Sequence, residues 1–290
     1  MNIQKSQKLR FGLYLPNFGE VAYARTLAEL ALESEDAGWD GFFLWDHVMH
    51  SKTQRSPMVD SLTALAAIAV KTKRIRLGTT ITPLARRRPW TLARQTVTLD
   101  HLSNGRLTLG VGLGDPAYAD FQMFGESGEK KDRAEKLDEG LEILTGFWTG
   151  KQFSYKGKHY AIEKARFLPP TKQKPRIPIW VGGFWPNKAP FRRAAKYDGV
   201  IPLRLSSPIH LEPRDLRNIL YYTMKHRKNT SPFDAAVIGS GTEKSNAKST
   251  RRIQALAEAG MTWWLESLFL QRNSLKKMKK RIRKGPPTIS

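Results

Sequence analysis

Asp46 and His47 are the neighbouring side chains in this sequence best suited to chemistry. Histidine has an ordinary pKa near neutrality, so it can transfer a proton or stabilise a developing negative charge. Adjacent residues at a strand end point to opposite sides, so Asp46 could face a different way from His47. The pair predicts a catalytic role for His47 with Asp46 beside it. The alternative is that His47 only caps a loop by hydrogen bonding.

Two glycine clusters could bring backbone N–H groups close to a phosphate. They are Gly110–Gly114, with the sequence Gly-Val-Gly-Leu-Gly, and the pair Gly182 and Gly183. Glycine permits close backbone approach, and the N-terminus of a following helix adds a favourable dipole. Glycines at strand ends also make ordinary turns, and that alternative stays open. Charge-assisted contacts could come from nearby arginines: Arg86, Arg87, Arg88 and Arg204.

Aromatic residues also lie near the ends of the predicted strands and could line a binding site for a planar ring. Ordinary packing explains each of them equally well when it is taken singly. They are Phe18, Trp45, Tyr118, Phe124, Phe184 and Trp185. The chain has no cysteine, which excludes disulfides, thiolate metal ligands and a cysteine nucleophile. Neither a histidine–carboxylate metal motif nor a phosphate-binding Gly-Lys-Ser/Thr loop is present, so we expect no metal site.

Short apolar segments that alternate with segments of helical period must position these residues. The segments rich in Val, Ile, Leu and aromatics are typical of strands buried on both faces. The predicted strands are Arg10–Leu15, Gly41–Trp45, Ile75–Ile81, Arg106–Val111, Ile177–Val181, Gly199–Leu203, Phe233–Ile238 and Thr262–Glu266. The predicted helices are Ala22–Ala37, Asp60–Lys71, Trp90–Leu102, Asp132–Trp148, Asn187–Lys196, Pro213–Lys228, Ser249–Ala259 and Ser274–Arg283.

Eight such strand–helix units predict an α/β fold, a single (β/α)8 TIM barrel that spans residues 1–290 as one domain. An open doubly wound sheet is the alternative, but its dinucleotide fingerprint is missing. The segment Phe153–Tyr160 predicts a short hairpin insertion before strand 5, and Gly239–Thr250 predicts a mobile loop. In such a barrel the carboxyl ends of the strands form the active site, which is where the candidate residues fall.

The charge is strongly basic, because 49 Lys and Arg outnumber 26 Asp and Glu to give +23. Such a field attracts polyanions, including nucleic acid and phosphorylated cofactors. The basic residues are scattered over many elements, so a nucleic-acid- or polyanion-binding protein is the second hypothesis and not the first. We see no membrane span and no secretory signal, and we expect a cytoplasmic protein.

In order and spacing, seven motifs resemble the bacterial-luciferase-like family of flavin-dependent oxidoreductases, almost from end to end. The most specific is Thr-Leu-Asp-His-Leu-Ser-Asn-Gly-Arg-Leu-Thr-Leu-Gly-Val-Gly at 98–112. The others are Phe-Gly-Leu-Tyr-Leu-Pro-Asn at 11–17, Gly-Trp-Asp-Gly-Phe-Phe-Leu-Trp-Asp-His at 38–47, Ile-Arg-Leu-Gly-Thr at 75–79, Pro-Ile-Trp-Val-Gly-Gly at 178–183, Ala-Lys-Tyr-Asp-Gly at 195–199 and Ala-Gly-Met-Thr-Trp-Trp-Leu-Glu at 259–266.

The resemblance implies a TIM barrel that binds FMN or the 5-deazaflavin coenzyme F-420 at its carboxyl rim. It implies that Gly182 and Gly183 receive the cofactor phosphate and that Thr79, Thr80 and Ile81 pass the ring, with a cis bond between Thr80 and Ile81. It implies that His47 faces the flavin ring near its reactive edge. It further implies that Gly112 and Gly114 line the phosphate and ribityl side, that Asp115 is a site carboxylate, and that Trp45 borders the cofactor within the triplet Trp-Asp-His.

That triplet looks more like the deazaflavin-using members, so F-420 is slightly preferred over FMN. A deazaflavin implies hydride transfer to or from a small-molecule substrate, whereas FMN implies oxygen activation with a separate flavin reductase as partner. A non-catalytic flavoprotein is a third hypothesis. Substrate contacts are expected from loops at 46–58, 115–130 and 204–213, and a homodimer is expected through the helices Asp60–Lys71 and Trp90–Leu102.

Overall fold

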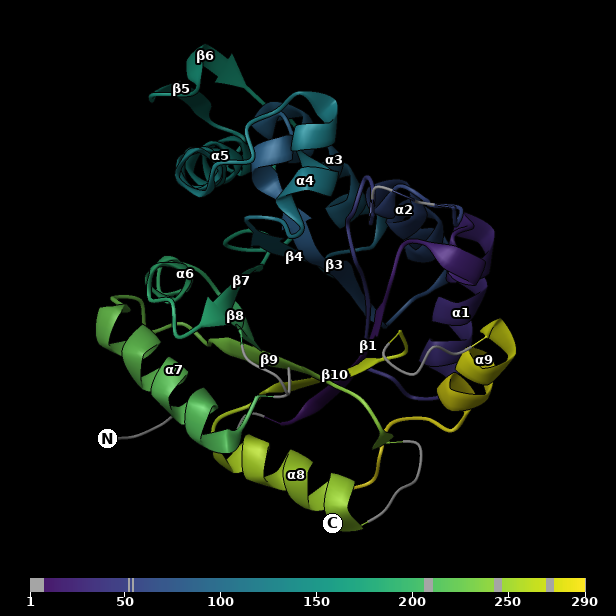
Figure 1. Cartoon of the computed structure of the whole chain (residues 1–290). Helices are drawn as coiled ribbons and strands as arrows, with labels where there is room; N and C mark the ends of the chain where they lie inside the picture. Colours follow the sequence, from purple (N-terminus) through teal and green to yellow (C-terminus); the bar gives the residue numbers. More distant parts are fainter. Residues whose placement is uncertain are drawn as a thin grey trace.

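Eight parallel strands close into a barrel around which the helices form an outer ring (Figure 1). The structure is a computed structural model, and it describes residues 8–51, 53, 55–205, 211–242, 247–269 and 274–289. Around the barrel the strand order is β1-β10-β9-β8-β7-β4-β3-β2. The bounds are β1 Arg10–Leu15, β2 Gly41–Leu44, β3 Arg76–Pro83, β4 Leu107–Gly112, β7 Ile179–Trp185, β8 Gly199–Arg204, β9 Asp234–Gly239 and β10 Trp263–Ser267.

Each barrel strand is followed by a helix, which confirms the predicted TIM barrel. The long helices are α1 Ala24–Asp36, α2 Ser61–Lys71, α3 Pro89–Leu102, α5 Lys130–Trp148, α6 Ala189–Ala194, α7 Pro213–His226, α8 Ala247–Glu258 and α9 Leu275–Arg283. Short helical turns that the sequence analysis missed are η1 Gly19–Val21, η2 Leu84–Arg86, α4 Ala117–Asp120 and η3 Gln122–Phe124. No helix within the described ranges is both long and apolar enough to cross a membrane.

Helix ends follow local sequence signals in most places. Gly38 and Gly260 adopt positive φ angles, of 86° and 103°, directly after α1 and α8, where a side chain would be strained. The Asp60 side chain accepts the backbone N–H of Thr63 and so caps α2. The predicted helix Ser249–Ala259 starts too late, because α8 already begins at Ala247 and Ser249 therefore lies inside it. Residues 243–246 of the predicted mobile loop lie outside the described part of the chain.

Three large aromatic side chains fill the barrel interior. The ring centroids of Phe43, Trp180 and Trp263 lie 5.2 to 5.7 Å from one another, and all three side chains are buried. Gly41 and Gly199 make room for them, since a Cβ at either glycine would meet an aromatic ring at 2.5 Å. The barrel therefore has a packed core below its carboxyl rim and is not a channel.

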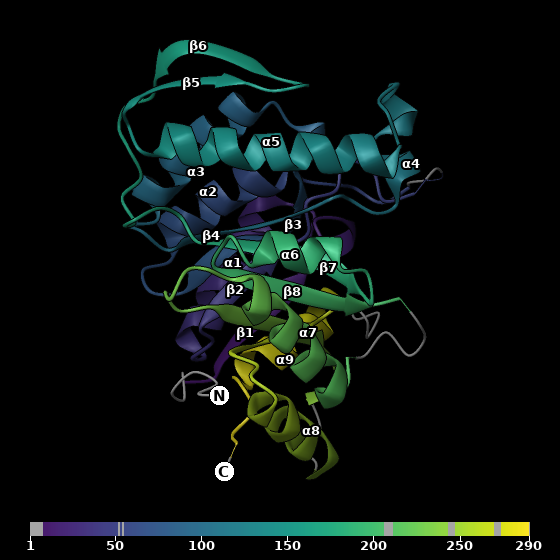
Figure 2. The ribbon, with the colours of Figure 1, turned by 90° about the vertical axis from the view of Figure 1, so that its left-hand side faces the viewer.

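The predicted hairpin is present as β5 Gln152–Lys156 and β6 Ala161–Arg166, and it lies along the outer side of α5 (Figure 2). The predicted bounds Phe153–Tyr160 cover β5 and the turn, but they end before the second strand, which begins at Ala161. The Glu139 carboxylate on α5 accepts the backbone N–H groups of the hairpin turn, from Lys158 at 2.8 Å and from His159 and Tyr160 at 3.1 Å. This carboxylate fixes the turn against the helix.

Candidate active site

The backbone of the segment that carries His47 is held by side chains from neighbouring elements. The buried Asn17, just after β1, donates from Nδ2 to the His47 carbonyl at 2.8 Å, and its Oδ1 accepts the His47 N–H at 3.4 Å. The Ser61 hydroxyl at the start of α2 donates to the Trp45 carbonyl. These contacts place His47 at the carboxyl rim of the barrel, as the sequence predicts.

The Asp46 carboxylate is buried in an ion pair. Arg87 donates from Nη2 to both carboxylate oxygens, at 2.7 and 2.9 Å, while Arg86 donates to the Asp46 carbonyl at 2.6 Å. Burial opposes ionisation, but the positive charges of Arg87 and Arg86 outweigh it and lower the pKa of Asp46. Asp46 therefore stays ionised and fixes η2 and the loop after β3 to the loop after β2.

The His47 imidazole has a different acidic neighbour, Asp120, at the end of α4. His47 Nδ1 lies 3.0 Å from Asp120 Oδ2, and the other oxygen of this buried carboxylate accepts the Val48 N–H at 3.2 Å. An ionised carboxylate can only accept, so Nδ1 carries the proton in this bond. The pair resembles the histidine–carboxylate arrangement in which the acid sets the tautomer and orientation of the catalytic imidazole.

Aromatic rings wall the rim next to His47. The Trp45 ring lies 5.3 Å from Tyr14, 5.7 Å from Phe18 and 4.8 Å from Phe269, measured between centroids. His50 stacks on Phe18 at 4.3 Å. Beside them opens a cavity of about 360 Å³, lined by Phe18, His50, Ser51, Thr53, Arg55 and Ser56. Burial raises the pKa of Tyr14 far above its ordinary value, so its hydroxyl stays protonated.

The segment Thr79–Ile81 lies in β3, where the pairing with β4 shifts register between Thr79 and Thr82. The bond between Thr80 and Ile81 is cis, which confirms the expectation taken from the resemblance. Thr79 donates to the Gly110 carbonyl at 3.3 Å and accepts from Thr82 at 2.8 Å. The buried Thr80 hydroxyl has no hydrogen-bond partner within the part of the chain that the structure describes.

Three of the predicted cofactor glycines make room for neighbouring side chains. A Cβ on Gly182 or Gly112 would lie 1.8 or 2.8 Å from side-chain atoms of Ile81, so Ile81 occupies the space above them. A Cβ on Gly183 would lie 2.2 Å from Pro190 on α6. Close packing therefore gives these positions a steric reason to be glycine, and the phosphate contact stays a prediction.

Gly114 and Asp115 begin the loop that leads from β4 to α4. Gly114 has a φ of 82°, and its carbonyl accepts from Arg133 Nη1 at 2.7 Å. Arg133 also binds the Leu113 carbonyl at 2.9 Å, so one buried guanidinium anchors the loop. The Asp115 side chain is exposed and lies apart from the pairs described above.

The arginines predicted to contact a phosphate have protein partners. Arg86 and Arg87 bind Asp46, Arg88 lies over the Trp90 ring and Arg204 lies 3.6 Å from Asp215. Sequence reasoning missed Asp120, although it lies inside the loop 115–130 that was expected to contact substrate. Of the expected substrate loops, residues 52, 54 and 206–210 lie outside the described ranges.

Comparison with protein families matches residues 9–210 to luciferase-like monooxygenase. The F-420-dependent glucose-6-phosphate dehydrogenases of Nakamurella multipartita and Amycolatopsis mediterranei are 30% and 32% identical over 161 residues, 55% of this chain. The matched segment covers 47% and 48% of those proteins, so the chain spans about half the length of these curated relatives.

Solved structures share the fold. An F-420-dependent secondary alcohol dehydrogenase in complex with an F-420–acetone adduct superposes with a TM-score of 0.77 at 16% identity, covering 98% of this chain and all of that one. The long-chain alkane monooxygenase LadA gives a TM-score of 0.76 at 15% identity, covering 96% of this chain and 91% of that one. These likenesses extend over the whole barrel.

Proposed function

The chain belongs to the luciferase-like monooxygenase family, and from this premise we propose that it is an oxidoreductase that uses F-420 or FMN on a small organic substrate. The observation that carries the proposal is the His47–Asp120 pair at the carboxyl rim of the barrel, next to the aromatic wall. A hydride- or oxygen-transferring coenzyme requires from its protein an oriented proton carrier close to its binding site.

The residues at the rim fit a flat, polar-edged ring system. The buried hydroxyls of Thr80 and Ser267, on β3 and β10, have no hydrogen-bond partner among the described residues, so each can still bond a ligand. Tyr14 and Trp45 supply apolar surface nearby. Thr79, Thr80, Ile81, Gly112, Gly114, Gly182, Gly183 and Trp45 would hold the coenzyme. When bound, the coenzyme supplies the electron chemistry that amino-acid side chains lack.

In this proposal His47 holds or moves the proton at the reacting oxygen of the substrate. Asp120 keeps the proton on Nδ1, which leaves Nε2 as the atom that exchanges a proton. The ionised Asp46, paired with Arg87, positions the loop and takes no proton itself. The aromatic wall excludes water from the same place.

The 5-deazaflavin coenzyme is the preferred partner of the two. Both curated relatives named above carry F-420 in their names, and a chain of net charge +23 favours an anionic coenzyme. With F-420 the reaction would be a dehydrogenation or reduction. With FMN it would be an oxygenation, and a flavin reductase would be needed as a partner.

A titration of the purified apoprotein with F-420 and with FMN tests the proposal. Fluorescence should show saturable binding of F-420 that is clearly tighter than that of FMN, and salt should weaken it because the coenzyme is anionic. Tighter FMN binding would reverse the choice of coenzyme. If neither binds at about 0.1 mM, a concentration ten- to a hundredfold above a micromolar Kd, the oxidoreductase proposal is wrong.

Replacing Asp120 with asparagine should lower turnover by about 10- to 100-fold, the range seen when a group that orients a functional histidine is lost. The substrate KM should change little, because Asp120 acts through His47. Glu163→Gln on the exposed hairpin is the matched control. Turnover equal to that of the wild type, or a loss that appears in KM and not in turnover, would contradict the positioning role.

A further inference from the structure

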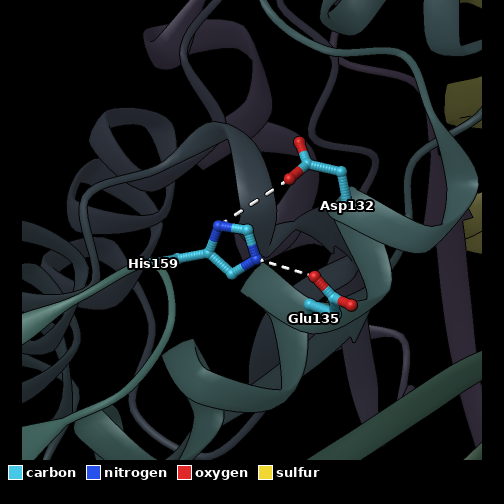
Figure 3. A group of neighbouring side chains, drawn as sticks. All are labelled: Asp132, Glu135 and His159. Carbon is cyan, nitrogen blue, oxygen red and sulfur yellow. Dashed lines mark hydrogen bonds and ion pairs between the residues drawn. The ribbon is translucent and has the colours of Figure 1, made fainter.

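On the far side of α5 from the barrel, three metal-ligating side chains meet at the hairpin turn. Asp132 and Glu135 lie one turn apart on α5, and His159 reaches toward both from the loop between β5 and β6 (Figure 3). His159 Nε2 lies 3.0 Å from Glu135 Oε2, and Nδ1 lies 3.7 Å from Asp132 Oδ1. One donor atom from each residue falls within 4.8 Å of the other two.

We propose that Asp132, Glu135 and His159 bind a divalent transition-metal ion of the Zn²⁺ type. Donors that bind one ion at about 2.0–2.2 Å must lie within roughly 4 Å of each other, so a small side-chain adjustment completes the set. One imidazole with two carboxylates suits Zn²⁺, Co²⁺ or Ni²⁺ better than Mg²⁺ or Ca²⁺, which favour oxygen donors alone. Three protein ligands leave a coordination position for water.

The histidine is held in place independently of its ring. Glu139, one turn further along α5 from Glu135, binds three consecutive N–H groups of the hairpin turn, including that of His159. The backbone of His159 is thus fixed, and its largely buried imidazole already lies between the two carboxylates. Such preorganisation reduces the ordering that ion binding requires.

Two lysines compete for the same carboxylates. Lys158 Nζ lies 2.7 Å from Glu135, and Lys136 Nζ lies 3.0 Å from Asp132. The Lys158 side chain is 67% exposed, so it can move into water when an ion takes its place. The alternative is that a protonated His159 merely bridges the two carboxylates to fasten the hairpin. The two explanations differ in the effect that removal of the Lys158 ammonium group has on Zn²⁺ affinity.

The sequence predicts no metal site, because it contains no ligand motif with short spacing. Glu135 and His159 are 24 positions apart and are brought together by the fold of the hairpin onto α5. The inference is independent of the proposed function, because neither the coenzyme nor the rim residues take part in it.

Calorimetric titration of the metal-stripped full chain with Zn²⁺ tests the site. One ion should bind per chain, and the unfolding midpoint should rise when Zn²⁺ is present. His159→Gln and Glu135→Gln should each weaken binding by at least about tenfold, since each removes a ligand. His226→Gln, which changes an exposed histidine at the end of α7, should leave binding unchanged.

Lys158→Met separates the metal site from a purely structural ion pair. It removes the competitor and should tighten Zn²⁺ binding by about two- to fivefold, the range expected when an exposed ion pair no longer competes with the ion. Absence of stoichiometric binding overturns the proposal. So does binding that is equally strong in His159→Gln and in the wild type, or unchanged affinity in Lys158→Met.

Discussion

Replacing His47 with alanine should lower turnover by about 10²- to 10⁴-fold, the contribution of a well-placed general acid–base group. The coenzyme affinity should change by less than about tenfold, because the proposed coenzyme contacts come mostly from β3, β4 and β7 and do not include the His47 ring. The geometry explains why turnover should fall while coenzyme affinity stays nearly unchanged. Asp120 orients the imidazole, and Asn17 holds its backbone whether or not the ring is present.

Steady-state kinetics and coenzyme titration on the same preparation measure both effects. His226→Ala, which removes an exposed imidazole on α7, serves as control and should retain wild-type turnover. If turnover in His47→Ala equals that of the wild type, the His47 ring only caps the loop by hydrogen bonding to Asp120, and the catalytic assignment fails. If turnover and coenzyme affinity fall together, the ring contributes mainly to the shape of the rim.

The second large effect is expected on stability, at the buried Asp46–Arg87 pair. Asp46→Ala should reduce the free energy of unfolding by about 3 kcal/mol, because it leaves the buried Arg87 guanidinium with only the half-exposed Asp60, 3.6 Å away, as a counter-charge. The double variant Asp46→Ala, Arg87→Met should recover part of that loss, since no unpaired charge remains. Denaturant unfolding measures all three proteins, with Glu163→Ala as an exposed control.

The pH dependence of this effect has a definite sign. The folded-state pKa of Asp46 lies below its ordinary value, chiefly because the positive charges of Arg87 and Arg86 outweigh the burial that would raise it. Its contribution is therefore fully present above the unfolded-state pKa of about 3.9 and is lost as the pH falls through the lower, folded value. The stability gap between wild type and Asp46→Ala should be constant near neutrality and narrow in acid. A gap that widens in acid would contradict the ion pair.

The sequence predicts the repeating elements well because their signals are local. The buried strands and the helices with terminal glycines, such as Gly38 and Gly260, lie within a few residues of their predicted bounds. Two adjustments arise from context. Ser249 has the chemistry of a helix cap, yet α8 begins two residues earlier, and the second hairpin strand extends to Arg166 because it pairs with β5.

The site was harder to predict because its key partners are distant in sequence. His47 is apparent from its type and its strand-end position, but Asp120 lies 73 residues away on a four-residue helix that has no clear pattern. Arg87 has the chemistry of a phosphate ligand, yet a buried carboxylate 41 positions earlier binds it. Gly182 suggests a ligand-binding position from its type alone. In the structure, the Ile81 side chain packs so close to it that only glycine fits.

The aromatic core of Phe43, Trp180 and Trp263 fills the interior of the barrel, so a ligand can reach the rim residues only from the carboxyl end of the strands. Coenzyme and substrate would both bind and dissociate through this one end of the barrel. In the proposed function, a coenzyme bound deeper than the substrate would therefore have to bind first and be released last.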